Sequence, residues 1–334
     1  MKMKQQRGVA LLVVLLILVV MVVLAANISN RFQTELFRTS NLVRQSQAKW
    51  YALGAETLVT KTLNQDIKDS PNRTHLGQYW ATPNQVFPVD EGVIMGDVRD
   101  GQACFNLNAI NGGSATAEST LPYNANVFKH LLIAVNVDEF DASQITDALR
   151  DWVDTDDELV PSLGAEDSWY QSLKVPYLAA NAPLADVSEL RLVRGISASI
   201  YRRLQPLVCA LPSNAQGAAV ELKVNVNTLR EAQAPLLSAL FLGQMGKDEA
   251  LTVLQARPKD GWESVATFMT IGEVMNSNTG LGDKAQKSID VNSHFFEARL
   301  QIEMDEVQVR FITLFKRQNS NKVVVIRRQY GGLE

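Results

Sequence analysis

The segment richest in groups that could do chemistry is residues 151–167, DWVDTDDELVPSLGAED. It carries seven acidic and no basic residues within seventeen positions, and Pro161 and Gly164 interrupt any helix there. Calcium favours loops of this kind, because it takes about six to eight oxygen ligands in flexible geometry. The sequence therefore predicts a calcium site, with these candidate ligands: Asp151, Asp154, Asp156, Asp157, Glu166 and Asp167.

The spacing of these acids does not follow the EF-hand pattern. Twelve positions counted from Asp154 end at Ala165, one short of Glu166, and the sixth position is not glycine. A calcium site here would have another geometry, and a solvated acidic loop remains the alternative. A glycosidase pair would need two carboxyls facing each other across a cleft, and nothing in the sequence indicates such a cleft.

Other common functional signatures are weak. The three histidines, His75, His130 and His294, lie far apart and form no zinc or catalytic-triad pattern. Residues 190–197, LRLVRGIS, resemble a helix-hairpin-helix turn, which can hold a DNA phosphate on backbone amides. However, the net charge is −4 and the pI about 5.6, whereas a nucleic-acid binder needs a basic face. We interpret the turn as structural and expect neither nucleic-acid binding nor catalysis.

The chain has 334 residues and a mass of 36.9 kDa, and its N-terminal segment has the composition of a membrane-spanning helix. Residues Val9 to Ala26 are eighteen apolar residues, which as a helix span roughly 27 Å, close to a bilayer core of about 30 Å. Lys2, Lys4 and Arg7 precede this run, and no acidic residue occurs before Glu35. The positive-inside rule therefore predicts a single membrane span with a cytoplasmic N-terminus and the rest of the chain on the opposite side of the membrane.

The helical pattern does not stop at the membrane. A cleaved signal peptide or an ordinary signal anchor would end near Ala26, yet apolar residues keep a three-to-four spacing to about Ile67, and the first proline is Pro71. This continuous helix would be roughly 90 Å long. The pattern predicts a membrane helix that runs directly into the core of a folded domain.

The junction before the apolar run is also specific. Arg7-Gly8 followed at once by Val9 resembles the leader of type IV pilins and type II secretion pseudopilins. That resemblance implies cleavage after Gly8 by prepilin peptidase. Such proteins usually carry glutamate at the fifth mature position, which pairs with a neighbouring N-terminal amine; here that position is Val13. Val13 suggests a subunit with nothing above it, the alternative being a membrane helix that never polymerises.

Strand patterns flank a central helical region. Residues 69–90 are rich in Pro, Asn and Thr and are expected to form a loop. Asp100-Gly101 between the apolar runs 92–95 and 103–107 predicts a hairpin. Alternation over 300–304 and 307–311, followed by the run 323–326, predicts half-buried antiparallel strands near the C-terminus.

The sequence between these strands has helical spacing, and FNLNAI at 105–110 is echoed by VNVNTL at 224–229. We read this as two helical subdomains inserted into a helix-plus-sheet domain, an α+β fold. The expected helices cover 126–137, 141–153, 186–194, 197–208, 228–242, 247–256 and 262–270. The expected domains are a leader (1–8), a transmembrane and spine helix (9–68), a sheet domain (69–107 and 286–334) and helical subdomains (108–212 and 213–285).

The two cysteines lie at the beginning and end of the first predicted helical subdomain. A periplasmic location would be oxidising, so Cys104 and Cys209 are expected to form a disulfide; two small buried side chains are the alternative.

Together these features resemble the minor pseudopilin K family of the type II secretion system. The residues that carry the resemblance extend in order along almost the whole chain: Arg7-Gly8-Val9, Phe105–Asn108, Asp151–Asp156, Gly164–Asp167 with Tyr170, Glu189–Gly195 and Val224–Thr228. The absence of glutamate at Val13 is also a trait of that family.

The resemblance implies a pseudopilin fold with a large all-α insertion and calcium in the acidic loop. It also implies a place at the tip of a periplasmic pseudopilus with minor pseudopilins I and J, where the subunit initiates assembly. Pseudopilin H, the major pseudopilin, the secretin and the exported protein are further expected partners. The alternatives are a minor pilin of a type IV pilus and a signal-anchored periplasmic enzyme.

Overall fold

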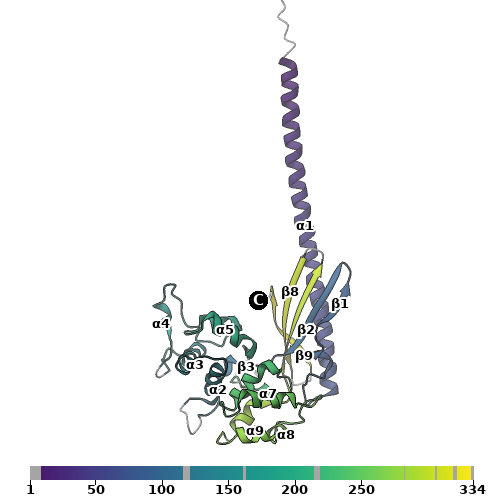
Figure 1. Ribbon diagram of the computed structural model, residues 1–334. Helices are drawn as coiled ribbons and strands as arrows, with labels where there is room; N and C mark the ends of the chain where they lie inside the picture. The colour runs from purple at the N-terminus through teal and green to yellow at the C-terminus, as the bar shows by residue number, and fades with distance from the viewer. Residues whose placement is uncertain are drawn as a thin grey trace, which may run out of the picture.

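The computed structural model describes residues 9–115, 121–160, 163–213, 219–281, 283–304, 307–318 and 322–331. The predicted leader, including Gly8, lies outside the described residues. The chain forms a long helix with a folded head at one end (Figure 1).

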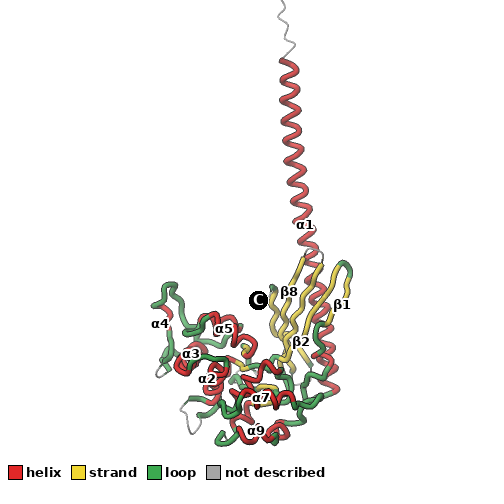
Figure 2. The backbone as a smooth tube through the Cα atoms, in the orientation of Figure 1, coloured by secondary structure: helices red, strands yellow, loops and turns green. Residues whose placement is uncertain are grey.

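Helix α1 spans Val9–Asp69, 61 residues without a break, so the prediction of one continuous helix is confirmed. Its N-terminal half projects away from the head, and its first buried residue is Ala48 (Figure 2). Within the described part of the chain, α1 is the one helix long and apolar enough to cross a membrane.

The second half of α1 covers one face of a five-stranded antiparallel sheet with the order β1-β2-β7-β8-β9. Small residues of the helix, Ala48 and Ala52, let it approach the aromatic and aliphatic side chains of the sheet, among them Phe296 and Phe311. The strands are β1 (Gln85–Val89), β2 (Gly92–Asp100), β7 (Phe295–Met304), β8 (Val307–Arg317) and β9 (Val323–Tyr330).

An ion pair between a buried carboxylate and an exposed guanidinium fixes the helix on this sheet. Both carboxylate oxygens of Glu56 accept hydrogen bonds from the Arg328 guanidinium of β9, each at 2.8 Å, and Thr313 of β8 donates to the same carboxylate at 3.2 Å. Such a bidentate contact sets the rotation of the helix as well as its position.

The hairpin predicted at Asp100-Gly101 is wrong. The hairpin lies earlier, where β1, inside the segment expected to be a loop, turns at Asp90 and Glu91 into β2; Glu91 has φ 65°. β2 continues to Asp100 because β7, from the far end of the chain, pairs with it over its whole length. The chain then leaves the sheet, and β3 (Phe105–Asn106) pairs in parallel with β4 (Val208–Cys209).

The region between β3 and β7 is helical, in two parts joined to the sheet at its lower end in Figure 1. The first contains α2 (Tyr123–Ala134), α3 (Glu139–Val153), α4 (Asp167–Gln171) and α5 (Ala198–Leu204). The second contains α6 (Ala234–Leu240), α7 (Lys247–Gln255), α8 (Val265–Met269), α9 (Gly272–Ser277) and α10 (Lys284–Ser288).

Several predicted helices differ in extent. The segment 186–194 is a 3₁₀ helix at Val187–Leu192 (η3), and 228–242 becomes α-helical only from Ala234. Helices α4, α9 and α10 were not predicted, because five or six residues are too few to show a helical period.

The two Asn-x-Asn sequences, at 106–108 and 225–227, adopt the same local structure. Asn106 and Asn225 each lie in a two-residue strand, and each side chain accepts a hydrogen bond from the backbone amide two residues later. β3 pairs in parallel with β4, and β5 (Val224–Asn225) pairs in parallel with β6 (Ile289–Asp290). In both subdomains the repeat therefore joins the entering chain to the leaving chain.

Candidate metal site

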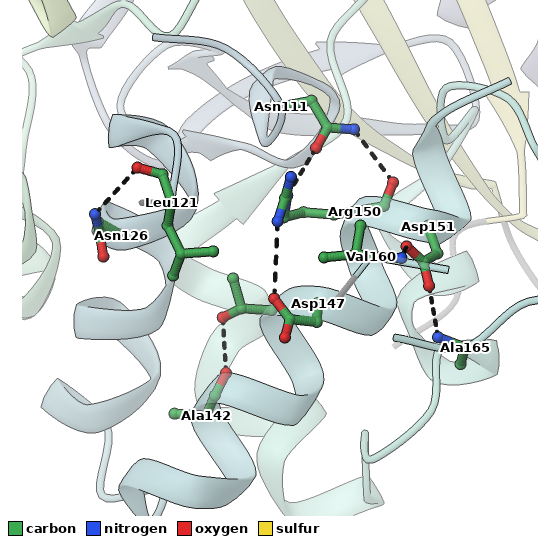
Figure 3. Close-up of polar contacts among 10 residues, drawn as sticks. Asn111, Leu121, Asn126, Ala142, Asp147, Arg150, Asp151, Val160 and Ala165 are labelled. Atoms are coloured by element: carbon green, nitrogen blue, oxygen red, sulfur yellow. Dashed lines mark hydrogen bonds and ion pairs between the residues drawn. The ribbon is translucent and has the colours of Figure 1, made fainter. Parts of the chain in front are cut away.

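The acidic segment begins where α3 ends. The Arg150 Nε donates to the Asn111 side-chain oxygen at 3.0 Å, and the Asn111 amide donates back to the Arg150 carbonyl at 3.2 Å (Figure 3). The Asp147 carboxylate lies 3.8 Å from the same guanidinium. This network fixes the last turn of α3 and, with it, the position from which the loop departs.

Asp151 holds the acidic loop in shape. Its carboxylate is fully buried and accepts hydrogen bonds from the Val160 amide at 3.0 Å and the Ala165 amide at 2.7 Å (Figure 3). A Cβ atom at Gly164 would lie 2.1 Å from an oxygen of Asp151, so only glycine permits this approach. Each oxygen of Asp151 accepts one backbone hydrogen bond, so this carboxylate ties the loop to the end of α3.

Among the residues that the structure describes around this loop, four side-chain oxygen atoms are buried and have no hydrogen-bond partner. They are both carboxylate oxygens of Glu166, Oδ1 of Asp154 and the side-chain oxygen of Asn181. Leaving buried oxygens unsatisfied is costly, and such atoms call for an explanation such as an ion. Carboxylate and amide oxygens are also the donors that a hard cation prefers.

The electrostatics of these groups agree with that explanation. Burial, then repulsion from Asp151, Asp154 and Asp157, raises the pKa of Glu166 to about 7. Burial and the neighbouring carboxylates Asp151 and Asp156 raise the pKa of Asp154 to about 6. Without a cation, the charged forms of these two side chains are destabilised.

The remaining predicted ligands already have backbone or side-chain partners. Asp156 accepts from the Glu158 amide at 3.0 Å, Asp167 from the Ala179 amide at 2.9 Å, and Asp157 from the Asn181 amide group at 2.8 Å. Within the described ranges, no three His, Cys, Asp or Glu side chains form a ready-made metal cluster. The open oxygens come instead from two carboxylates and one amide.

No sequence pattern pointed to Asn181, because it lies outside the acidic segment. It lies in the long loop between α4 and η3, has φ 43°, and its amide group reaches Asp157 twenty-four positions earlier. A lone asparagine in a loop carries no spacing signal, so only the folded chain shows that its oxygen belongs with the acidic segment.

An aromatic cluster and the helix-hairpin-helix turn support the loop. Trp152 and Tyr170 meet edge to face at 5.3 Å between ring centres. Arg194 donates to the Gly164 carbonyl at 3.0 Å and lies over the Trp169 ring. The helix-hairpin-helix turn therefore holds the acidic loop in place through the contacts of Arg194.

Cys104 and Cys209 are disulfide-bonded, with a sequence separation of 105. Cys104 directly precedes β3, and Cys209 is the second residue of β4, so the bond links the two ends of the first helical subdomain.

We expect the double variant Cys104→Ser, Cys209→Ser to unfold at lower denaturant concentration than the native chain. In the chain-entropy model a bridge closing about 100 residues contributes up to about 4.7 kcal/mol. Urea unfolding of both proteins, each with and without dithiothreitol, measures the difference. If the native chain loses no stability on reduction, the bridge does not stabilise the fold.

The predicted processing residues lie at the other end of the molecule. Val9 is the first residue of α1, and Val13 is on its exposed apolar surface. The structure thus separates two regions of interest, an apolar N-terminal helix and a loop with unpartnered oxygens far from it (Figure 1).

Comparison with known proteins assigns the family. Residues 103–213 and 224–292 match two family models, both described as type II secretion system protein K. Type II secretion system protein K of Aeromonas hydrophila is 47% identical over 99% of both chains, and that of Pectobacterium carotovorum subsp. carotovorum is 44% identical over 98% of this chain and 97% of the relative.

A solved structure agrees with this result. The crystal structure of the GspK-GspI-GspJ complex from enterotoxigenic Escherichia coli contains a chain that matches with a TM-score of 0.79 and 34% identity, covering 89% of this chain and 100% of that one. The match extends over the long helix, the antiparallel sheet and the helical insertion, and the relatives are components of a secretion system rather than enzymes. The chain belongs to the type II secretion system protein K family.

Proposed function

We propose that this chain is a minor pseudopilin that initiates and caps the type II secretion pseudopilus. In this proposal prepilin peptidase removes residues 1–8, and α1 from Val9 anchors the subunit in the inner membrane with its N-terminus cytoplasmic. The head lies in the periplasm and assembles with minor pseudopilins I and J, as the related chain does in its crystallised complex. The assembly helps folded proteins cross the outer membrane.

The observation that carries the capping role is the residue at the fifth mature position. Val13 is apolar, so it cannot neutralise an N-terminal amine of a subunit above it. The head supports the same role, because the two helical subdomains add bulk beside the sheet where a further subunit would have to fit (Figure 1). A subunit of this kind is suited to the first position of a filament.

We also propose that the acidic loop binds calcium. The open oxygens of Asp154, Glu166 and Asn181 are the donors that fit the ion, and Asp151 would hold the loop around it. When bound, calcium would neutralise these carboxylates and fix the loop to the neighbouring helices. Its role would be structural.

The capping role is tested by Val13→Glu in cells that lack the native gene. At the tip the new carboxylate has no amine to pair with, and an acid within a membrane helix costs about 2.5–3.5 kcal/mol. We therefore expect at least tenfold less exported protein in the medium than with the native chain. An internal subunit would tolerate or favour the glutamate, so undiminished export would contradict the capping role.

A matched control separates loss of assembly from loss of processing. Gly8→Leu should leave a full-length chain by intact mass, whereas Val13→Glu should be cut after Gly8 like the native protein. A native chain that keeps residues 1–8 in the presence of the peptidase would contradict the whole proposal.

A further inference from the structure

The head contains two large hydrophobic cores that are separate from each other. One core lies between α1 and the sheet and includes Leu63, Phe296 and Phe311. The other lies within the two helical subdomains, which share it and are together called the insertion below. Because each body has its own core, the contacts on the surfaces between them decide how the two bodies are oriented.

One set of these contacts joins the insertion to the end of the sheet where β2 ends and β7 begins. This end, the lower one in Figure 1, is called the base below. At the base, the Asp100 carboxylate accepts hydrogen bonds from Asn225 and Thr228 of the second helical subdomain. Leu211 and Leu314 belong to a small apolar cluster there. A joint at one end of the sheet fixes the position of the insertion, but its angle to the sheet needs a second contact.

That second contact lies on β9, away from the base. Arg327 donates to the Ala185 carbonyl, and the Gln329 amide donates to the Asp186 carboxylate at 2.9 Å. β9 begins at the base with Val323, opposite the end of β8. Gln329 is six residues further along the strand, which is roughly 20 Å from the base. A contact at this distance from the joint determines the angle between the two bodies.

Each side of the contact is held firmly by its own body. On the insertion, the buried Asn108 side chain accepts from the Leu184 amide at 2.7 Å and donates to the Leu184 carbonyl at 2.9 Å, directly before Ala185. On the sheet, Arg328 binds Glu56 of α1. Since neighbouring side chains of a strand point to opposite faces, β9 contacts α1 on one face and the insertion on the other.

We infer that Arg327 and Gln329 form a latch with Ala185 and Asp186 that fixes the angle between the insertion and the sheet. With the latch closed, the insertion lies beside the face of the sheet that is turned away from α1. With the latch open, the insertion turns about the base and moves away from this face. The inference goes beyond the proposed function and does not depend on it.

The latch is built to open more easily than the base. Arg327, Gln329 and Asp186 are only half-buried, so water can replace their hydrogen bonds at little cost. The second carboxylate oxygen of Asp186 accepts from the Ser188 amide at 2.9 Å and keeps that bond when Gln329 leaves. At the base, by contrast, the hydrogen bonds of Asp100 are buried and water cannot replace them.

The test measures the distance between the two bodies by double electron–electron resonance on the full-length chain in detergent. The native cysteines are bonded to each other, so nitroxide labels attach to the cysteines introduced by Val175→Cys in the first helical subdomain and Val86→Cys on β1. Both sites are exposed, at 75% and 57%. In the latch variant Arg327→Ala, Gln329→Ala we expect the most populated distance between the labels to change by about 5 Å or more, and its distribution to broaden.

The matched control is Arg299→Ala, Gln301→Ala on β7. These two residues have the same types and the same spacing as the latch residues, and they lie on the same face of the sheet. Their hydrogen-bond partners, Glu297 and Glu303, belong to their own strand. The control therefore removes the same charge from the same face without touching the insertion, and we expect the native distance.

The melting temperature separates a change of angle from a loss of folding. Because exposed polar contacts contribute little to stability, the latch variant should melt with the control. An unchanged distance in the latch variant would overturn the inference. So would an equal change in the control, which would mean that the charge of the sheet face sets the angle. A latch variant that melted below the control would show that these contacts support folding, which also overturns the inference. Each of these results leaves the proposed function standing.

Discussion

Replacement of Asp100 by alanine is expected to lower the free energy of unfolding by about 3–5 kcal/mol. Asp100 is the last residue of β2, and its side chain is buried. It accepts hydrogen bonds from the hydroxyls of Ser293 and Thr228 at 2.6 and 2.5 Å, from the Asn225 amide at 3.0 Å and from the Gln102 backbone at 2.7 Å. Alanine would leave several buried donors without an acceptor.

The cost is large because these groups belong to different parts of the molecule. Asp100 ends a sheet strand, Thr228 and Asn225 begin the second helical subdomain, and Ser293 leads back into β7. The carboxylate therefore joins the sheet to the insertion. Urea unfolding of the purified full-length chain would measure the loss, and a shared transition would show that both parts still unfold together.

The matched control is Asp97→Ala on the same strand. Asp97 forms a partly exposed ion pair with Arg99 at 2.7 Å, and such pairs contribute about 0–1 kcal/mol. If Asp100→Ala lost no more stability than this control, the buried network would not hold the parts of the head together.

The protonation of Asp100 gives the result a pH dependence. Burial raises the pKa of Asp100 above its usual value of 3.8, against the opposing effect of its hydrogen bonds. The folded chain therefore binds this proton more tightly than the unfolded chain, and the contribution of Asp100 to stability falls as the pH rises from about 3.8 through the folded pKa. Asp100→Asn does not titrate, so it should remove this part of the pH dependence.

The elements that could be predicted from the sequence are those with a hydrophobic pattern that repeats over many residues. The spine helix was predictable because the unbroken apolar run Val9–Ala26 continues into apolar residues at a three-to-four spacing up to about Ile67. Strands β7 and β8 were predictable because polar and apolar residues alternate. The hairpin at Asp100-Gly101 failed for the opposite reason. A local turn signal carries no information about β7, whose Phe296 pairs with Asp100 across almost two hundred positions.

The candidate metal site also depends on contacts that the local sequence does not reveal. Composition alone pointed to residues 151–167, yet it could not distinguish Asp151, which bonds to backbone amides, from Glu166, whose oxygens have no partner. That difference depends on where Val160 and Ala165 turn, and this is decided by the packing around Gly164. Asn181 can be recognised as part of the candidate site only in the folded chain, where its side chain contacts Asp157.

Calcium is expected to raise the melting temperature of the native chain, and the double variant Asp154→Asn, Glu166→Gln should abolish that increase. A ligand at a hundred times its dissociation constant stabilises a protein by about 2.7 kcal/mol, which corresponds to a few degrees for a head of this size. Without calcium the variant should melt at or above the native protein, because the two carboxylates that burial and mutual repulsion destabilise have become neutral. Thermal unfolding in EDTA and in excess calcium measures both effects.

The opposite signs of these two effects distinguish a metal site from an ordinary structural loop. If Asp154 and Glu166 only supported the fold, their loss would lower the melting temperature in EDTA as well, as we expect for Asp151→Asn, which removes an acceptor from the loop backbone. Asp283→Asn, in an exposed ion pair with Lys287, should change neither measurement. A calcium-dependent increase that survived in the double variant would place the ion elsewhere. No increase in the native chain would mean that the open oxygens of Glu166 do not hold calcium.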